Sequence, residues 1–352
     1  MTISKNSLSC HTSGSIKTCE NIRNQRVNMI RNYITSFAFV MLASFINAQQ
    51  DPQFTQWYMD PVVSNIAAAG QSNLTNISAI YRQQWASMDG RPETTLLNFD
   101  TRFGEGPVGL GGQVYQETIG NENNTMIKIG PSFTFNPNSS GTKISGGIGF
   151  TFLNKKIGDN YAWFPPDGQE SISSDPAIPN GVTSGLTFDL DFGLFMRNSD
   201  KYYAGISSTS LIQSAFTDFG ITRTRHYYIM GGYNYSISGD ALVLRTNFLT
   251  KTDLAATAID FNINALINDM FWAGLSYRPG DAIAPVLGYQ LRMEKQEQIT
   301  ASEQFLRIGY SYDITTSELQ TYSAGSHEIF LSYGFMFKTT PILNKYANPR
   351  FL

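Results

Sequence analysis

Few side chains in this 352-residue chain have the types and spacing that catalysis requires. Beyond residue 48 there are two histidines, His226 and His327, and neither has around it the three or four ligands that a metal site needs. Ser332 and His327 are two of the three groups of a hydrolase triad, but neither stands in the context of a nucleophile elbow. The glycine-rich run 109–112 precedes no helical pattern, so it favours strand curvature over phosphate binding. We therefore expect no enzyme, no metal site and no cofactor.

The first 48 residues have the pattern of an export signal. Arg31 is followed by an apolar stretch, 33–46, that is shorter than the roughly 20 residues of a membrane-spanning helix. Ala48 is the kind of small residue that a signal peptidase accepts. We expect residues 1–48 to be a leader whose part 29–48 is a signal peptide. A membrane-anchoring helix is the alternative.

Composition limits the class of protein that the remaining chain forms. Charged residues make up 15% of the chain, against about 25% in soluble proteins, and aromatic residues make up 13%. Removing residues 1–48 takes away five of the 25 basic and one of the 28 acidic residues, which leaves a net charge of −7. That charge argues against nucleic acid as a partner. The removed part also holds both cysteines, Cys10 and Cys19, so no disulfide or thiolate metal site is expected beyond it.

Apolar and polar side chains alternate along most of the chain. In 186–194 the apolar residues share one face, and Asp189 and Asp191 share the other. An unpaired backbone group in hydrocarbon costs several kcal/mol, so strands that face lipid must close into a barrel. We expect an all-β fold, a transmembrane antiparallel outer-membrane β-barrel of about 14 strands over residues 76–338. The expected strands are 76–85, 93–103, 107–117, 125–135, 142–154, 184–196, 201–210, 225–237, 241–250, 257–266, 270–278, 282–292, 303–314 and 327–338.

Charges and connections predict an orientation for this barrel. A charge that faces lipid at mid-depth costs roughly 2–4 kcal/mol. The charged strand residues are therefore expected in the lumen; they are Asp189, Asp191, Arg245, Asp260, Arg278, Arg307 and Asp313. One set of connections is short, and the other holds the long loops 155–183, 211–224 and 315–326, which is the pattern of periplasmic turns and outer loops. The charged stretch 293–302 is expected to be a periplasmic turn, although it is long for one.

Two segments lie outside the expected strands. Residues 49–75 contain Phe54, Trp57 and Tyr58 and are expected to face the periplasm or the lumen, as a plug, a partner site or a loose lead-in. Residues 339–352 are expected to form a periplasmic C-terminal tail.

Several collinear stretches resemble the PorP/SprF family of the type IX secretion and gliding system of Bacteroidetes. They are DPQFTQWYMDP at 51–61, YRQQW at 81–85, GRPET at 90–94, RHYY at 225–228, GLSYR at 274–278, GYSYD at 309–313, SEL at 317–319 and GSHEI at 325–329. The chain departs from the family in two places. Residues 65–70 stand where the family usually has an Asn-Pro-Ala run, and 155–183 looks individual, so the departures concern partner specificity.

The resemblance implies a multi-pass protein of the Gram-negative outer membrane that supports the export of adhesins with type B C-terminal domains and anchors them at the cell surface. It implies four kinds of contact: outer-membrane lipid, the type B domain of the adhesin, the periplasmic ring, and the peptidoglycan-linked parts of the secretion and gliding machinery. The long outer loops 155–183 and 211–224 are the expected contact surface for cargo.

Seven residues are expected to contact a partner: Phe54, Trp57, Tyr58, Arg82, Trp85, His327 and Glu328. Arg82 and Trp85 have an alternative interpretation as a lumen arginine and a tryptophan of the interfacial girdle. Two other functions stay open. A channel or transporter for small or hydrophobic solutes would have an open, conducting lumen, and a membrane-embedded hydrolase would lose activity when Ser332 or His327 is changed.

Overall fold

The computed structural model describes residues 52–336, except 73, 105, 138–140, 159–181, 199–200, 218–219, 240 and 298–299, and the side chains of 294–303. The predicted signal peptide, the predicted tail 339–352 and most of the loop 155–183 lie outside the described residues. Within the described residues, no helix is both long and apolar enough to cross a membrane.

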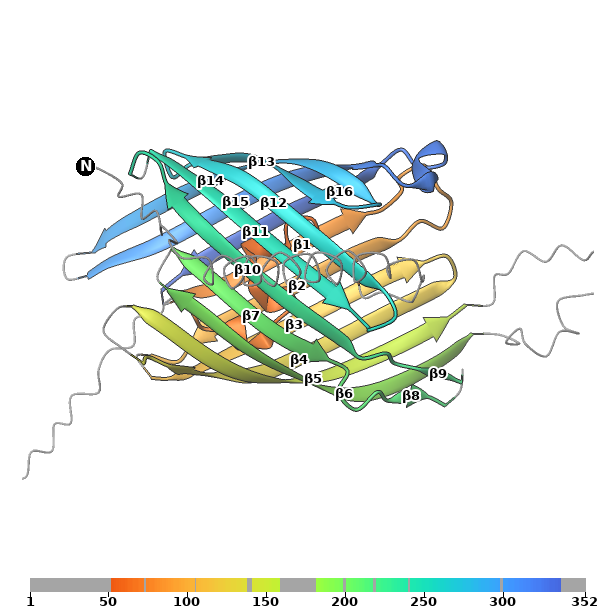
Figure 1. The fold of residues 1–352 in the computed structure, drawn as a ribbon. Helices are drawn as coiled ribbons and strands as arrows, with labels where there is room; N and C mark the ends of the chain where they lie inside the picture. Colours follow the sequence, from red (N-terminus) through yellow and green to blue (C-terminus); the bar gives the residue numbers. More distant parts are fainter. Residues whose placement is uncertain are drawn as a thin grey trace, which may run out of the picture. The chain divides into compact units, whose positions relative to one another are not determined.

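Fourteen antiparallel strands form a closed barrel (Figure 1). Neighbouring barrel strands are consecutive along the chain, and β16 pairs with β1 to close the sheet. The barrel strands are β1 Thr75–Gln83, β2 Glu93–Arg102, β3 Val108–Ile119, β4 Glu122–Phe135, β5 Thr142–Ile157, β6 Thr183–Asn198, β7 Tyr202–Thr209, β10 His226–Ser236, β11 Leu242–Thr252, β12 Thr257–Ile267, β13 Phe271–Arg278, β14 Ala282–Glu297, β15 Thr300–Thr315 and β16 Ser326–Phe335. The predicted all-β barrel of about 14 strands is confirmed.

The side-chain alternation separates an apolar outer face from a polar inner face. On β6, Leu186 and Phe188 point outward and are 70% and 40% exposed, whereas Thr187 and Asp189 point inward and are buried. Each outward apolar side chain is accommodated by hydrocarbon, and each backbone group between them bonds to a neighbouring strand. The seven charged residues predicted to avoid lipid all lie on the inner face.

Two connections differ from expectation. The predicted turn 293–302 is wrong: β14 and β15 continue as a paired hairpin to Glu297 and Thr300. This hairpin reaches furthest to the left in Figure 1. The backbone pairing runs without a gap from the pair Val286 and Ser311 to the pair Glu297 and Thr300. The predicted loop 211–224 contains a small hairpin of its own, formed by β8 Ala215–Phe216 and β9 Ile221–Thr222.

The end of the barrel where β1 begins and β16 ends carries mostly short turns. We assign it to the periplasm, because bacterial barrels have short periplasmic turns and longer outer loops. The opposite, extracellular end carries the connection between β5 and β6, the segment with β8 and β9, and the short 3-10 helix η5 Glu318–Thr321.

Residues 52–72 form a plug inside the barrel, drawn in orange in Figure 1. This is one of the three placements that the sequence left open. The plug has three 3-10 helices, η1 Trp57–Met59, η2 Pro61–Val63 and η3 Ile66–Ala68. Asp60 and Asn65 cap the second and third by accepting hydrogen bonds from backbone N–H groups two residues on, at 3.1 and 3.0 Å. The plug supplies about half of the apolar core, which lies in the lumen.

Candidate functional site

The plug is held against the barrel wall at a group of strand glycines that have no side chain. We call these residues, Gly109, Gly111, Gly147, Gly193 and Gly205, the glycine band. A Cβ atom on Gly147 of β5 would lie 2.8 Å from the Cα of Ala67, and one on Gly193 of β6 would lie 2.0 Å from Asn65 Oδ1. A Cβ atom on Gly205 of β7 would lie 2.9 Å from Asn65 Nδ2. Only glycine permits a backbone approach this close. The band therefore accommodates the plug and fixes where it sits.

The glycine run 109–112 belongs to the same band. A Cβ atom on Gly109 would lie 2.6 Å from the carbonyl oxygen of Ala69, and one on Gly111 would lie 2.8 Å from Ile66 Cδ1. Strand curvature, the role predicted from the sequence, does not describe these two positions fully, because they also make room for the plug. The sequence lacked any signal for this role, since the contact joins segments about forty residues apart.

Asn65 joins the plug to the backbone of two neighbouring wall strands. Its Nδ2 atom donates hydrogen bonds to the carbonyl oxygens of Leu194 and Ile206, at 3.0 and 3.2 Å. Hydroxyl groups complete the contact, since Ser132 donates to the Ala69 carbonyl at 2.6 Å. Buried backbone groups of the plug thus find partners on the wall, as buried polar groups must.

A buried ion cluster, formed by Arg82, Arg278, Asp313 and Glu328, holds the other end of the plug. The Glu328 carboxylate accepts hydrogen bonds from the backbone N–H groups of Thr55 and Gln56, both at 2.7 Å. Arg82 donates from Nη1 to Glu328 at 3.1 Å and from Nη2 to Asp313 at 2.8 Å. These residues are at most 5% exposed.

Thr55 is the plug residue on which the cluster converges. Its hydroxyl donates to Asp313 at 2.7 Å and accepts from Arg82 Nη1 at 2.9 Å. Arg278 approaches Asp313 from the far side at 3.3 Å and pairs through Nε with Asp260 at 2.6 Å. Every buried charge here has an opposite charge and further hydrogen bonds, which is the condition under which buried ions are tolerated.

A second polar anchor holds the middle of the plug. Asp60 accepts hydrogen bonds from Asn98 at 3.0 Å and from the hydroxyl of Ser78. The N–H of Gly70 donates to Asp100 at 3.0 Å. Burial raises the pKa of the Tyr58 hydroxyl, and the Glu328 carboxylate adds to the shift, so this plug residue stays a neutral phenol.

Five of the seven predicted partner residues meet in the lumen. Phe54, Trp57 and Tyr58 are buried plug residues, and Arg82 and Glu328 hold the plug. Phe54 lines the extracellular cavity, whereas the other four line neither cavity, so a partner would reach those four only after the plug moves. The lumen position is one of the two interpretations that the sequence left open for Arg82.

The remaining two predicted residues lie apart from the plug. Trp85 is half-buried in the connection that follows β1, and its backbone N–H donates to Ser326 Oγ at 3.1 Å. His327 lies on the outer face, where its Nδ1 hydrogen-bonds the Tyr310 hydroxyl at 2.8 Å. Ser332 is five residues further along β16 and therefore faces the lumen, so the two groups of the hydrolase alternative lie on opposite faces of the sheet.

Sequence reasoning placed Arg278 and Asp313 in the lumen but did not include them in the site, and it missed Thr55. The signal was present in the resembling stretches. Thr55, Arg82, Arg278, Asp313 and Glu328 come from five different stretches, those at 51–61, 81–85, 274–278, 309–313 and 325–329. The structure brings all five together within one cluster. Five of the eight stretches that carry the resemblance thus meet in the cluster that holds the plug.

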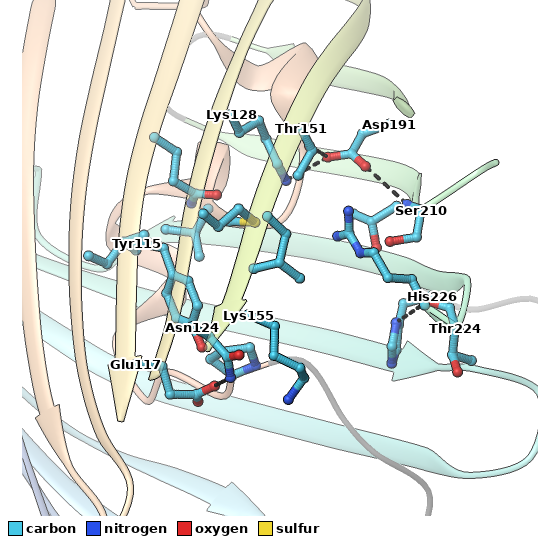
Figure 2. Close-up of a pocket in the computed structure, with 18 of the residues that line it drawn as sticks. Tyr115, Glu117, Asn124, Lys128, Thr151, Lys155, Asp191, Ser210, Thr224 and His226 are labelled. Atoms are coloured by element: carbon cyan, nitrogen blue, oxygen red, sulfur yellow. Dashed lines mark hydrogen bonds and ion pairs between the residues drawn. The ribbon is translucent and has the colours of Figure 1, made fainter. Parts of the chain in front are cut away.

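Two cavities lie on either side of the plug. The extracellular cavity has a volume of about 510 Å³ and is lined by Phe54 and Ser64 of the plug and by residues at the outer ends of the strands. Figure 2 shows Lys128, Thr151 and Asp191 together on its wall. The periplasmic cavity has a volume of about 880 Å³ and is lined by the other side of the plug, including Asp60.

The site binds and positions a segment of the chain. Its carboxylates accept hydrogen bonds from N–H groups, hydroxyls and guanidinium groups, and each is committed to the plug or to the wall. Among the described residues, no three His, Cys, Asp or Glu side chains are placed to hold a metal ion.

The comparisons with known proteins identify the sequence family. The family model described as type IX secretion system membrane protein PorP/SprF matches residues 46–333. No curated protein matches the chain. Among solved structures, the chain is similar to the toluene transporter TbuX of Ralstonia pickettii, with 9% identity and a TM-score of 0.45 over 79% of this chain and 93% of that one. It is also similar to a FadL homologue of Pseudomonas aeruginosa, with 11% identity and a TM-score of 0.40 over 74% and 88%. These two likenesses carry no argument about function.

Proposed function

Because this chain belongs to the PorP/SprF family of type IX secretion system membrane proteins, we propose that its barrel supports the export of adhesins with type B C-terminal domains and anchors them at the cell surface. The protein is a multi-pass component of the outer membrane and of the type IX secretion system. The proposal adds the cargo class and the anchoring role to that description.

One observation carries the proposal: five of the eight family-like stretches converge on a plug that occupies the lumen. Arg82 donates a hydrogen bond to the Thr55 hydroxyl, and Glu328 accepts hydrogen bonds from the backbone N–H groups of Thr55 and Gln56. A barrel arranged in this way acts through what binds its two ends and its plug. This supports a role in holding proteins at the membrane, in contact with periplasmic machinery on one side and cargo on the other.

The alternative of an open channel for small solutes receives less support. A plug that is bonded to the wall at both ends lies between the two cavities. A solute path along the lumen would require the plug to leave, against the hydrogen bonds of the ion cluster and the contacts of the glycine band.

The extracellular end offers an ordered surface for cargo. Asp189 accepts hydrogen bonds from the backbone N–H groups of Ile212 and Ser214, at 2.8 and 3.2 Å. Asp191 accepts one from Ser210 at 3.0 Å. These bonds fold the segment after β7 against the barrel rim, so a partner binds it without a large ordering cost. The loop 155–183 remains part of the proposed cargo surface, although most of it lies outside the described residues.

Gene deletion tests the proposed function when two classes of type IX cargo, with and without a type B domain, are measured separately. We expect adhesin with a type B domain to disappear from the surface of cells that lack the gene, and a plasmid copy to restore it. Type IX cargo without a type B domain serves as the control and should still be exported. Normal surface display of the adhesin in the deletion strain would reject the proposal.

A further inference from the structure

The periplasmic half of the lumen has an excess of positive charge, and one of its cations, Lys143, also donates a hydrogen bond to the plug at the carbonyl of Gln71, at 3.1 Å. Six basic residues line the cavity on this side: Lys143, Arg197, Lys201, Arg245, Arg292 and Arg307. Three acidic residues line it: Asp60, Asp100 and Asp269. Among the described lining residues, cations therefore outnumber carboxylates two to one, in a chain whose net charge beyond residue 48 is negative. We call this cavity the basic vestibule.

The carboxylates of the basic vestibule are already bonded to the protein. Asp60 and Asp100 accept hydrogen bonds from wall side chains and, in the case of Asp100, from the plug. Asp269 pairs with Arg292 at 3.0 Å and accepts a hydrogen bond from Gln290 at 3.1 Å. With six cations and three carboxylates, the lining has a formal net charge of +3, so the field that an incoming ligand meets is positive, and a lumen with low-dielectric walls concentrates that field.

The extracellular cavity lacks this excess. Lys128 pairs with Asp191 at 2.7 Å, and Lys155 pairs with Glu122. Figure 2 shows the first of these pairs, with Lys128 turned toward Asp191. Three basic and three acidic residues, with one histidine, line this cavity in the described part of the chain. The charge difference along the barrel axis is therefore a property of one end and not of the lumen as a whole.

The cations of the basic vestibule stand on opposite walls. Lys143 and Arg197 are on β5 and β6, and Arg292 and Arg307 are on β14 and β15. In the barrel order, five strands separate β6 from β14, and Figure 1 shows the two pairs of strands on opposite sides of the barrel. A small anion contacts one wall at a time. An extended chain with several carboxylates contacts both.

The surface between the cations suits a peptide. Asn234 and Gln290 add amide side chains to the lining, and Phe195 and Leu266 provide apolar contact. Phe305 lies under the guanidinium carbons of two vestibule arginines, at 5.0 and 5.3 Å from its ring centroid. Mixed polar and apolar lining of this kind recognises a peptide more specifically than charge alone.

We propose that the basic vestibule binds an acidic peptide segment of a partner that enters the barrel from the periplasm. The chain's own C-terminal tail is excluded by its charge, because residues 338–352 hold Lys338, Lys345 and Arg350 and no acidic residue. The bound segment also touches the plug, since Met59 and Asp60 line the vestibule. The assignment of the peptide to a secretion partner rests on the proposed function, whereas the binding of acidic peptide does not.

Peptide binding to the protein purified from outer membranes in detergent tests this proposal. The probe is a fluorescein-labelled peptide of glutamates, compared by anisotropy with peptides of lysines and of glutamines of the same length. The vestibule variant is Lys201→Gln with Arg292→Gln, because both side chains are exposed at the rim and their loss leaves the barrel wall intact. The matched control is Lys155→Gln with Arg223→Gln in the extracellular cavity. Heat-modifiable gel mobility verifies that each variant is folded.

We expect the glutamate peptide to bind at least about tenfold more tightly than the glutamine peptide, with an affinity that falls as salt rises. The vestibule variant should weaken it about tenfold, and the control variant should change it less than about twofold. Equal affinity for the two peptides, or equal affinity in wild type and vestibule variant, would overturn the proposal. If the vestibule variant loses peptide binding but cells that carry it display adhesin normally, the site stands and its assignment to a secretion partner falls.

Discussion

Replacing Glu328 with alanine should release the plug. The change removes the only side chain that accepts hydrogen bonds from the buried N–H groups of both Thr55 and Gln56 in the described structure. It also removes one of the two carboxylates that Arg82 contacts. The barrel wall keeps its backbone ladder, because Glu328 acts through its side chain.

The expected size of the effect follows from the groups left without partners. A buried donor that loses its acceptor costs about 1–3 kcal/mol, and two such donors remain on the plug. Arg82 keeps Asp313 at 2.8 Å, so little further cost comes from the guanidinium. A net loss of about 3 kcal/mol of plug binding raises the population of the unseated plug about 100-fold.

A single cysteine in the plug reports this population. The chain beyond residue 48 has no cysteine, so Val62→Cys is the only reactive thiol there. Val62 is 3% exposed and lines the periplasmic cavity, so a membrane-impermeant maleimide added to intact cells reaches it from the extracellular side only when the plug moves. We expect labelling to be about 100-fold faster when Glu328→Ala is added. Glu328→Gln should give an intermediate rate, because one acceptor oxygen remains.

Glu318→Ala is the matched control for this experiment. Glu318 is an exposed carboxylate on η5 and makes no contact with the plug among the described interactions. It should leave the labelling rate unchanged. If Glu328→Ala with Val62→Cys is labelled no faster than Val62→Cys alone, the ion cluster does not hold the plug, and the reasoning from buried donors is refuted.

Three further changes test other parts of the molecule. Gly193→Ala should unseat the plug as well, because its Cβ would lie 2.0 Å from Asn65 Oδ1. Gly146→Ala is the control, because its Cβ meets only an ordinary contact at 3.6 Å. Equal labelling of the Val62→Cys reporter in both variants would contradict the role of the glycine band in seating the plug. Asp189→Ala should cost the segment after β7 about 2–4 kcal/mol of local stability through lost backbone hydrogen bonds and make it a target for protease added to intact cells; unchanged resistance would show that other contacts order it. Arg278→Met should cost about 3–5 kcal/mol of stability and so lower the temperature at which the barrel unfolds on gels, because it leaves the buried carboxylate of Asp260 without its cation, whereas Asp313 keeps Arg82. An unchanged transition would remove Arg278 from the cluster.

The barrel was predictable because lipid imposes a strict rule on the chain. Alternation of side chains placed Asp189 and Asp191 on the inner face, and the structure confirms it. The hairpin of β14 and β15 was mistaken for a turn because the sequence 293–302 is charged and lacks the apolar alternation. Its backbone groups pair across the two strands all the same.

The plug was not predictable to the same degree. Its three short helices have neither the period of a strand nor the length of an amphipathic helix, so periodicity carried no signal in 52–72. The cluster depends on contacts such as Arg82 with Asp313, which are 231 residues apart. Each partner alone looks like any charged residue of a lumen. Only the resemblance, which set these stretches side by side, contained the information that they belong together.

The position of the ion cluster has a consequence for how the cylinder is completed. Arg82 lies on the first strand and Glu328 on the last, and the two stand directly opposite each other in the register of the pair that shuts the sheet. The Glu328 carboxylate also binds the plug, through the backbone N–H groups of Thr55 and Gln56. Extracting that segment therefore also strips side-chain support from the one junction where the two chain ends of the wall meet. The pairing of β1 with β16 and the seating of the plug are therefore mechanically coupled, and a force applied to the plug is transmitted to the two strands that close the barrel.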